Sequence, residues 1–135
     1  MQSNSDNFKK INAPIFFGLS HLGQVFSLCW SKKVGKCFVY DSDKKSLNSF
    51  KKKNFTLEEP KLKKLKLNKI QFLKKIEDIE NFKYIFFTYD TPLNIKNGKP
   101  ELNYIYQNLK KILNLKFQST TYLIISSQIN PDLIK

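Results

Sequence analysis

The chain has 135 residues, of which 41% are hydrophobic and 14% aromatic, so it can bury one core and is too apolar to be globally disordered. Its 24 basic residues outnumber 11 acidic ones, and the net charge of +13 raises the question of a nucleic-acid partner. All 24 are lysine, whereas specific nucleic-acid binders favour the bidentate contacts of arginine. We therefore expect no nucleic-acid binding beyond non-specific charge contacts.

Several other classes are disfavoured by what the sequence lacks. No apolar run approaches the roughly 20 residues that span a bilayer, and the first residues contain no apolar signal-peptide stretch. We expect no membrane partner and a cytoplasmic location. The cysteines, Cys29 and Cys37, have no metal-ligand spacing, and His21 is the single histidine. We therefore expect no metal site and two reduced, buried thiols.

The first half of the chain alternates apolar runs with helical patterns, after a flexible tail predicted at residues 1–12. In chain order, its predicted elements are a buried strand at 13–17, a helix at 22–32, a strand at 37–40 and a helix at 44–52. Lysines lie at the end of the first helix, where cations are favourable, and Gly35 is a typical helix stop. Asp43 is a suitable cap for the second helix.

The second half continues the alternation. Its predicted elements are one or two basic helical turns within 61–69, a strand at 70–72, an acidic helical turn at 77–80, a strand at 84–88, a helix at 102–113 and a strand at 121–125. In the helix, Leu102, Ile105, Tyr106, Leu109 and Ile112 recur at helical spacing. Strands that alternate with helices require a parallel sheet. We predict one α/β domain over 13–135, a Rossmann-type, mostly parallel sheet flanked by helices.

A glycine-bounded turn lies between the first strand and the first helix. A dinucleotide-binding turn reads G-x-G-x-x-G, and this chain has Gly18 and Gly23 in the outer places and Ser20 in the middle. Such a turn directs backbone N–H groups and the positive helix end at one place. We predict that Gly18, Ser20, His21, Leu22 and Gly23 bind a cofactor. The alternative is an ordinary strand-to-helix turn.

An aspartate ends the second predicted strand. Asp41 follows Gly18 by 41 − 18 = 23 positions, close to the roughly 20 expected for the carboxylate that binds an adenosine ribose. A carboxylate there accepts hydrogen bonds from the ribose hydroxyls and repels a 2′-phosphate, which predicts NAD rather than NADP. The alternative is that Asp41 only starts the turn at 41–45 and caps the following helix.

Five segments occur in the same order as the signature segments of nucleotide-sugar 6-dehydrogenases, the family of UDP-glucose and GDP-mannose dehydrogenases. These segments are FGLSHLGQVFSLCWS, VYDSDKKSLNSF, EEPKL, FFTYDTPLNIKNGKPELNYI and LIISSQINP. The chain resembles the amino-terminal NAD domain of that family over residues 14–131. The resemblance implies that Asp41 accepts the ribose, that Thr91 lies against the cofactor beside the fourth strand, and that Ser127 supplies a hydroxyl after the fifth.

Two departures from the family pattern concern the cofactor. Ser20 replaces the middle glycine, at a cost of about 1–3 kcal/mol if the position requires positive φ. Asp90 replaces the glycine of a Gly-Thr-Pro motif and brings a negative charge near a dianionic ligand. We therefore expect NAD to bind weakly.

The resemblance also implies an activity, the oxidation of a sugar-nucleotide 6-hydroxyl to a carboxylate with NAD. In the family, a separate sugar domain supplies a cysteine nucleophile, and neither Cys29 nor Cys37 matches it. We expect no catalysis by this chain alone, as a truncated enzyme, a stand-alone relic or a subunit that pairs with a sugar-nucleotide-binding chain. The competing hypothesis is a basic, non-catalytic module whose lysines within 61–75 meet nucleic acid or an anionic surface.

Overall fold

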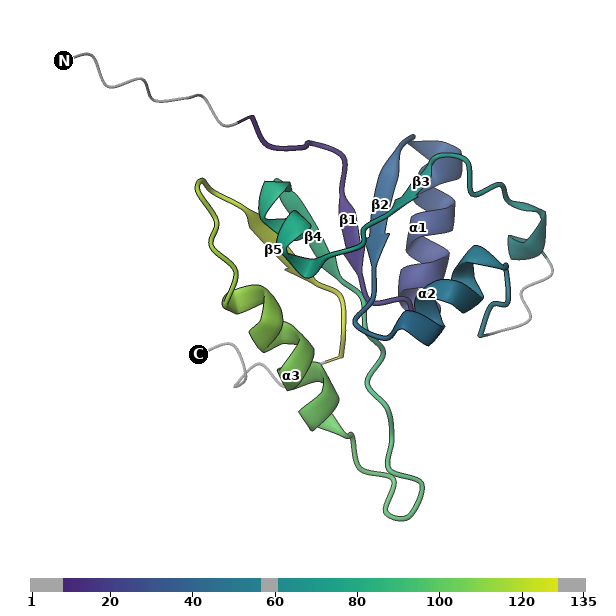
Figure 1. The fold of residues 1–135 in the computed structure, drawn as a ribbon. Coiled ribbons are helices and arrows are strands. Elements are labelled where there is room, and N and C mark those ends of the chain that lie inside the picture. The colour runs from purple at the N-terminus through teal and green to yellow at the C-terminus, as the bar shows by residue number, and fades with distance from the viewer. Residues whose placement is uncertain (1–8, 57–60, 129–135) are drawn as a thin grey trace.

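The structure, a computed structural model, describes residues 9–56 and 61–128, and strands and helices alternate along it (Figure 1). The elements are β1 (Ile15–Phe17), α1 (His21–Lys33), β2 (Cys37–Tyr40), α2 (Lys44–Lys51), the 3-10 helix η1 (Leu62–Lys64), β3 (Ile70–Phe72), the 3-10 helix η2 (Ile76–Asn81), β4 (Tyr84–Phe87), α3 (Leu102–Leu113) and β5 (Tyr122–Ile125). Each predicted helix and strand is present. Residues 1–8 of the predicted tail and the Glu-Pro at 59–60 lie outside the described residues.

The five strands form one sheet in the order β3-β2-β1-β4-β5, and every pair of neighbours is parallel. The central strand β1 pairs on both sides, so that Ile15 lies opposite Phe38 in β2 and Ile85 in β4. The prediction of a Rossmann-type parallel sheet is confirmed. The chain winds outward from β1 in both directions, which makes the β1–β4 boundary a topological switch point.

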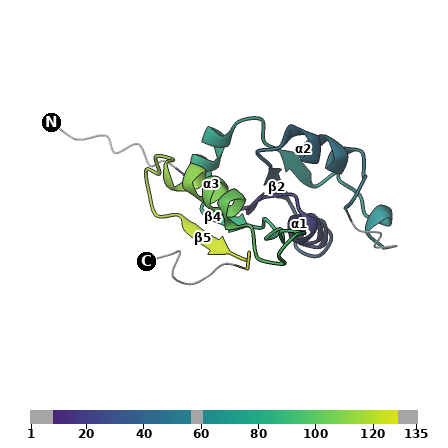
Figure 2. The same cartoon turned by 90° about the horizontal axis from the view of Figure 1, so that it is seen from below.

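Helices cover both faces of the sheet, with α1 and α3 on opposite sides (Figure 2). Neighbouring side chains of β1 point to opposite faces, as the pleat of a strand requires. Phe17 belongs to the core cluster that includes Ile105 of α3, and Phe16 packs in the other cluster with Leu28 of α1 and Phe50 of α2. Burial on both faces explains why β1 and β2 are continuous apolar runs without alternation.

Helix α1 meets the sheet through a mostly small and polar stripe. Its buried residues are Gly23, Gln24, Ser27, Leu28 and Ser31. The hydroxyls donate to backbone within the helix, Ser27 Oγ to Gly23 O at 2.7 Å and Ser31 Oγ to Leu28 O at 2.8 Å. These local bonds satisfy the polar groups, so small residues can bring the helix close to the sheet.

The two cysteines lie in different environments. Cys37 in β2 is buried, and burial raises the pKa of its thiol to about 12. Cys29 is exposed, so the prediction of a second buried thiol is wrong. Adjacent helical positions differ by about 100°, which takes Cys29 off the buried stripe that contains Leu28.

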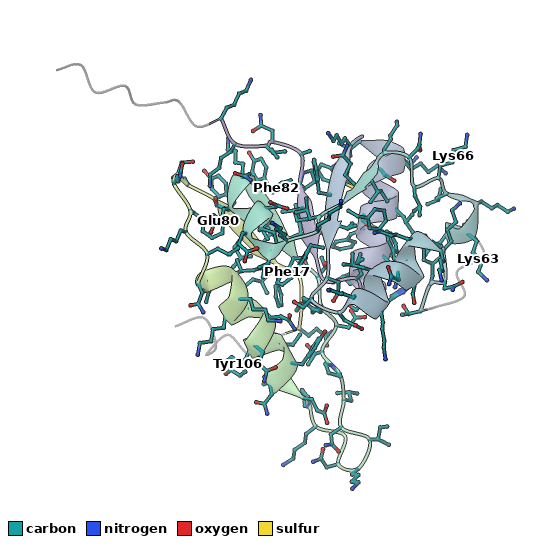
Figure 3. The ribbon with its side chains drawn as sticks, in the orientation of Figure 1. Phe17, Lys63, Lys66, Glu80, Phe82 and Tyr106 are labelled. Carbon is teal, nitrogen blue, oxygen red and sulfur yellow. The ribbon has the colours of Figure 1, made fainter. Side chains whose placement is uncertain are left out.

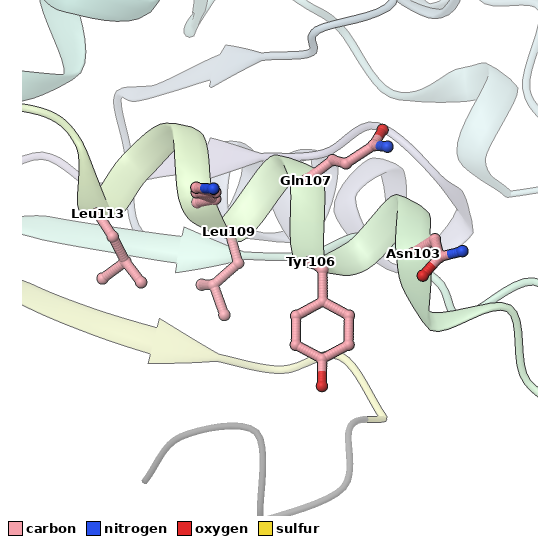
Figure 4. A pocket seen from close by; sticks show the side chains of 6 residues that line it. Asn103, Tyr106, Gln107, Leu109 and Leu113 are labelled. Carbon is pink, nitrogen blue, oxygen red and sulfur yellow. The ribbon is translucent and has the colours of Figure 1, made fainter.

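Helix α3 buries Ile105, Leu109 and Ile112 together with one amide, Asn108. Tyr106 shares their helical spacing but is 46% exposed and projects from the outer side of the helix (Figure 3). Along that side lies an open cavity of about 490 Å³, to which Tyr106 and Leu113 contribute (Figure 4). None of the helices in the described part of the chain combines the length and apolar character needed to cross a bilayer.

Candidate functional site

The carboxyl ends of the strands and the start of α1 meet at one edge of the sheet, the lower edge in Figure 1. Open parallel sheets bind ligands outside this edge, next to the switch point. The structure brings together here the eight residues predicted to bind a cofactor. They are Gly18, Ser20, His21, Leu22 and Gly23 after β1, Asp41 after β2, Thr91 after β4 and Ser127 after β5.

Both glycines of the turn occupy positions that no other residue fits. Gly18 has φ +112°, and a Cβ built on it would lie 2.7 Å from Cδ2 of the Tyr89 ring. A Cβ on Gly23 would lie 1.7 Å from the carbonyl oxygen of Gly18. Gly23 therefore allows α1 to approach the turn, which is the function of the third glycine in a dinucleotide-binding motif.

Ser20, in the middle place, has ordinary extended backbone with φ −69° and ψ −176°. The positive φ on which the expected strain depends is absent. Its hydroxyl donates to the carbonyl oxygen of Thr88 at 2.8 Å and accepts from the N–H of Asp90 at 2.7 Å. The loop after β4 thus engages this hydroxyl both as donor and as acceptor.

The N-terminus of α1 is capped by a residue distant in sequence. Asp90 Oδ2 accepts a hydrogen bond of 3.0 Å from the N–H of His21, the first residue of the helix. Ser20 stands at the N-cap position but makes no side-chain cap bond. A carboxylate at this end is favourable for the helix dipole. It also lies where the phosphates of a dinucleotide would be expected.

Asp41 is 3% exposed, and donors surround its carboxylate. Oδ2 accepts from the N–H of Leu19 at 2.7 Å, and Oδ1 accepts from the N–H of Asp43 at 2.8 Å and from the Tyr89 hydroxyl at 3.1 Å. Burial raises the pKa of Asp41 above its ordinary value, although the three hydrogen bonds oppose the shift. The cap of α2 belongs to Asp43, whose Oδ1 accepts from the N–H of Lys45 at 2.9 Å.

Tyr89 is the residue of this edge that the sequence reasoning missed. It is 2% exposed, and its hydroxyl accepts from the N–H of Ser42 at 3.1 Å while donating to Asp41. Burial and the Asp41 charge both raise the pKa of Tyr89, so it stays protonated as a donor. The available signal was an aromatic hydroxyl in the segment that follows the apolar run of β4.

A second missed contact joins this edge to α3. Ser42 Oγ donates to Asn108 Oδ1 at 2.8 Å, and Asn108 Nδ2 donates to the carbonyl oxygen of Tyr104 at 3.0 Å. The signal for it was one amide among the inward-facing apolar residues of α3. A buried amide needs partners, and Ser42 is one of them.

Thr91 and Ser127 tie the loops after β4 and β5 together. Thr91 Oγ1 donates to the carbonyl oxygen of Gln128 at 2.6 Å, and Ser127 Oγ donates to that of Tyr89. The two loops and the start of α1 enclose a cavity of about 350 Å³. Its lining includes Leu22, Tyr89, Asp90, Thr91, Ser127 and Gln128.

The edge fits a dinucleotide in its backbone: a glycine turn, a helix N-terminus and an acid that ends β2. The side chains fit less well, because three donors of the chain itself already bond to Asp41 and the Asp90 carboxylate accepts from the N–H of His21. Across 9–56 and 61–128, no three His, Cys, Asp or Glu side chains gather as ligands of a metal ion would.

Lysines gather at the other end of α1. A groove of about 520 Å³ runs between the end of that helix and the segment around η1, from which Lys63 and Lys66 project (Figure 3). The charged residues that line it are Lys32, Lys61, Lys64, Lys66 and Lys69. No aromatic side chain is among its described lining residues.

Comparison with known proteins gives one family. The model of the UDP-glucose/GDP-mannose dehydrogenase family, NAD binding domain, matches residues 13–133. No curated protein sequence matches the chain.

Solved structures share the fold at low sequence identity. A GDP-mannose dehydrogenase from Pseudomonas aeruginosa has 19% identity and a TM-score of 0.75 over 90% of this chain and 29% of its own. A UDP-D-ManNAc dehydrogenase from Pyrococcus horikoshii has 19% identity and a TM-score of 0.69 over 87% of this chain and 29% of its own. An NDP-N-acetyl-D-galactosaminuronic acid dehydrogenase from Methanosarcina mazei Go1 has 17% identity and a TM-score of 0.72 over 90% of this chain and 28% of its own. The chain spans less than a third of the length of each.

Proposed function

Because the chain belongs to the UDP-glucose/GDP-mannose dehydrogenase family, whose NAD-binding domain it matches over residues 13–133, we propose that it binds NAD at the carboxyl edge of its sheet. The family resemblance read from the sequence is thereby confirmed, and NAD is the cofactor of the domain family.

One contact carries the assignment of the site: Asp41 Oδ2 lies 2.7 Å from the N–H of Leu19, inside the glycine turn. The carboxylate proposed for the ribose is therefore adjacent to the turn proposed for the pyrophosphate. The N–H groups at the start of α1 would face the phosphates, and Thr91 and Ser127 would border the half of the cofactor nearer β5. NAD supplies an acceptor for the hydride that leaves the substrate carbon.

Calorimetric titration with NAD and NADP tests this assignment. We expect NAD to bind weakly and more tightly than NADP, because the Asp41 carboxylate repels a 2′-phosphate. Asp41→Asn should narrow the difference between the two cofactors, whereas Asp43→Asn, a control on an exposed carboxylate of the same loop, should leave it unchanged. NADP affinity equal to or above that for NAD would contradict the proposal.

We further propose that sugar-nucleotide oxidation requires a sugar-binding part with its own cysteine nucleophile, on a partner chain or another segment. We propose that this reaction takes place in the cytoplasm. The solved relatives are more than three times as long as the part of them that this chain matches. The Cys37 thiol begins β2, at the opposite edge of the sheet, and its raised pKa disfavours the nucleophilic thiolate. Cys29 lies on the exposed side of α1.

The assay is NADH formation by the purified 135-residue chain with UDP-glucose or GDP-mannose, where we expect none. Cys29→Ser and Cys37→Ser are the matched controls. Steady NADH formation that both cysteine variants retain would contradict this proposal.

The lysine groove favours a second candidate function, the binding of a polyanion such as DNA or RNA. Its lysines attract phosphates, but a groove without aromatic rings offers no surface for base stacking. We expect low-salt filter binding that fades at physiological ionic strength and is reduced in the double variant Lys64→Gln with Lys66→Gln. Lys96→Gln with Lys99→Gln removes equal charge elsewhere. Sub-micromolar binding that persists at physiological salt and needs the groove lysines would put this candidate first.

A further inference from the structure

We propose that Tyr89 and Asp90 are the residues that set the cofactor affinity of this site. They engage its ribose acceptor and its helix N-terminus in hydrogen bonds within the chain, and a dinucleotide has to displace those bonds to bind. This inference rests on the proposed function, because it concerns the same site.

The acceptor capacity of the Asp41 carboxylate is nearly filled. Each carboxylate oxygen offers about two lone-pair sites. Oδ1 already accepts from the Tyr89 hydroxyl and from the N–H of Asp43, and Oδ2 accepts from Leu19. Oδ2 keeps one lone pair, but with 3% of the residue exposed no ribose hydroxyl reaches it. At Oδ1, a ribose hydroxyl can bind only in place of the Tyr89 hydroxyl.

The Tyr89 ring is held in place by its neighbours. The ring lies against Gly18 so closely that a Cβ on this residue would be 2.7 Å from Cδ2 and 2.8 Å from Cγ of the ring. Edge-on contacts hold it from two other sides, with ring centroids 5.2 Å from Phe17 and 5.4 Å from Tyr104. Tyr89 is thus part of the core, so the arrangement that exposes Asp41 costs packing as well as hydrogen bonds.

The Asp90 carboxylate accepts a hydrogen bond from the N–H of His21, at the helix end where the cofactor phosphates would bind. A phosphate has to replace a group of like charge at this position. The side chain is exposed, so it can turn away without disturbing the core. Asp90 therefore competes with the phosphates by charge, whereas Tyr89 competes with the ribose by position.

One loop carries both Tyr89 and Asp90, and hydrogen bonds fix its position. The hydroxyl of Ser127 holds the carbonyl oxygen of Tyr89, the hydroxyl of Thr91 holds that of Gln128, and Ser20 bonds to the backbone on both sides of Tyr89. The loop after β4 thus holds both residues in the positions where they compete with a cofactor.

The test compares NAD binding by the parent chain, Tyr89→Phe, Asp90→Ala and the double variant in calorimetry. Tyr89→Phe keeps the packing of the ring but removes the bonds of its hydroxyl to Asp41 and Ser42, so displacing the side chain no longer costs the bond to the carboxylate. We expect each single variant to bind NAD about tenfold more tightly, the factor that corresponds to about 1.4 kcal/mol for a bond to a charged group. Tyr122→Phe makes the same chemical change at an exposed position and should alter nothing.

A second measurement, NMR of the backbone amide resonances of Leu19 and His21 without cofactor, reports on the hydrogen bonds at Asp41 and Asp90. We expect the His21 resonance to move in Asp90→Ala and the Leu19 resonance to move in Tyr89→Phe. Unchanged amide resonances, or NAD affinities equal to or below that of a parent chain that binds NAD, would overturn this inference and leave the proposed function standing. Absence of NAD binding by the parent and by every variant would overturn both.

Discussion

The two ends of helix α1 carry opposite charges, and they differ in how those charges are held. At the N-terminal end, the Asp90 carboxylate bonds to the first N–H of the helix and Asp41 is buried under three donors. At the C-terminal end, Lys32 and Lys33 and the lysines around η1 are exposed side chains about a groove. Each sign suits the helix dipole, but only the N-terminal charges belong to a specific network of bonds. This difference distinguishes a site with specific hydrogen bonds, at the N-terminal end, from a charged surface without them in the described part of the chain, at the C-terminal end.

The largest effect that this comparison predicts is for Gly23→Ala. Its Cβ would lie 1.7 Å from a backbone oxygen, so α1 has to move away from the turn, which we expect to cost about 3 kcal/mol of unfolding free energy. Urea unfolding measures the loss. Gly98→Ala is the control, because a Cβ there meets nothing within 4 Å and its positive φ costs only about 1 kcal/mol. Equal losses of unfolding free energy for the two variants would contradict the explanation from the close approach of α1 to the turn.

Next comes Asp41→Asn, which puts an amide NH₂ opposite at least one buried donor and should cost about 2 kcal/mol near neutral pH. Because burial raises the pKa of Asp41, its stabilising contribution is complete below 3.8, the ordinary value, and falls as pH rises through the raised pKa. The advantage of the parent over Asp41→Asn should therefore be largest in acid. Urea unfolding over a pH series checks the sign, and an advantage that grows with pH would contradict the burial argument.

Ser20→Gly should have a smaller effect, about 1 kcal/mol, through the loss of two hydrogen bonds to the loop after β4. Since Ser20 has negative φ, glycine relieves no strain at this position. Thermal unfolding checks the loss. A more stable Ser20→Gly variant would show that the serine strains the turn after all.

The smallest effect belongs to the lysine end. Lys64→Gln with Lys66→Gln should change the unfolding free energy by less than about 0.5 kcal/mol, because both side chains are exposed. Urea unfolding measures this change in unfolding free energy. A loss above 1 kcal/mol would mean that these lysines form a structured network comparable to that of the other end.

The order of elements was predictable because hydrophobic periodicity is a local property of the chain, and the helix over 102–113 was placed with both ends correct. The glycine turn and Asp41 were also recognisable, since their spacing in sequence reflects one strand-turn-helix unit. The exposure of Cys29 was not, because α1 buries serines and a glutamine that look like surface residues. Tyr89 was missed because its bond to Asp41 depends on the pairing of β1 with both β2 and β4, and β4 is distant from β1 in sequence.

The same distant cap has a consequence for how the molecule folds. The start of α1 receives Asp90 from 69 positions away, and the Gly18 carbonyl receives the Thr88 hydroxyl from 70 positions away. During synthesis, the first strand-helix-strand unit emerges well before either partner exists. Contacts of such long sequence separation slow folding, because loop-closure entropy precedes their gain. The first turn of α1 should therefore be among the last segments to gain hydrogen-exchange protection on refolding, in step with the docking of β4.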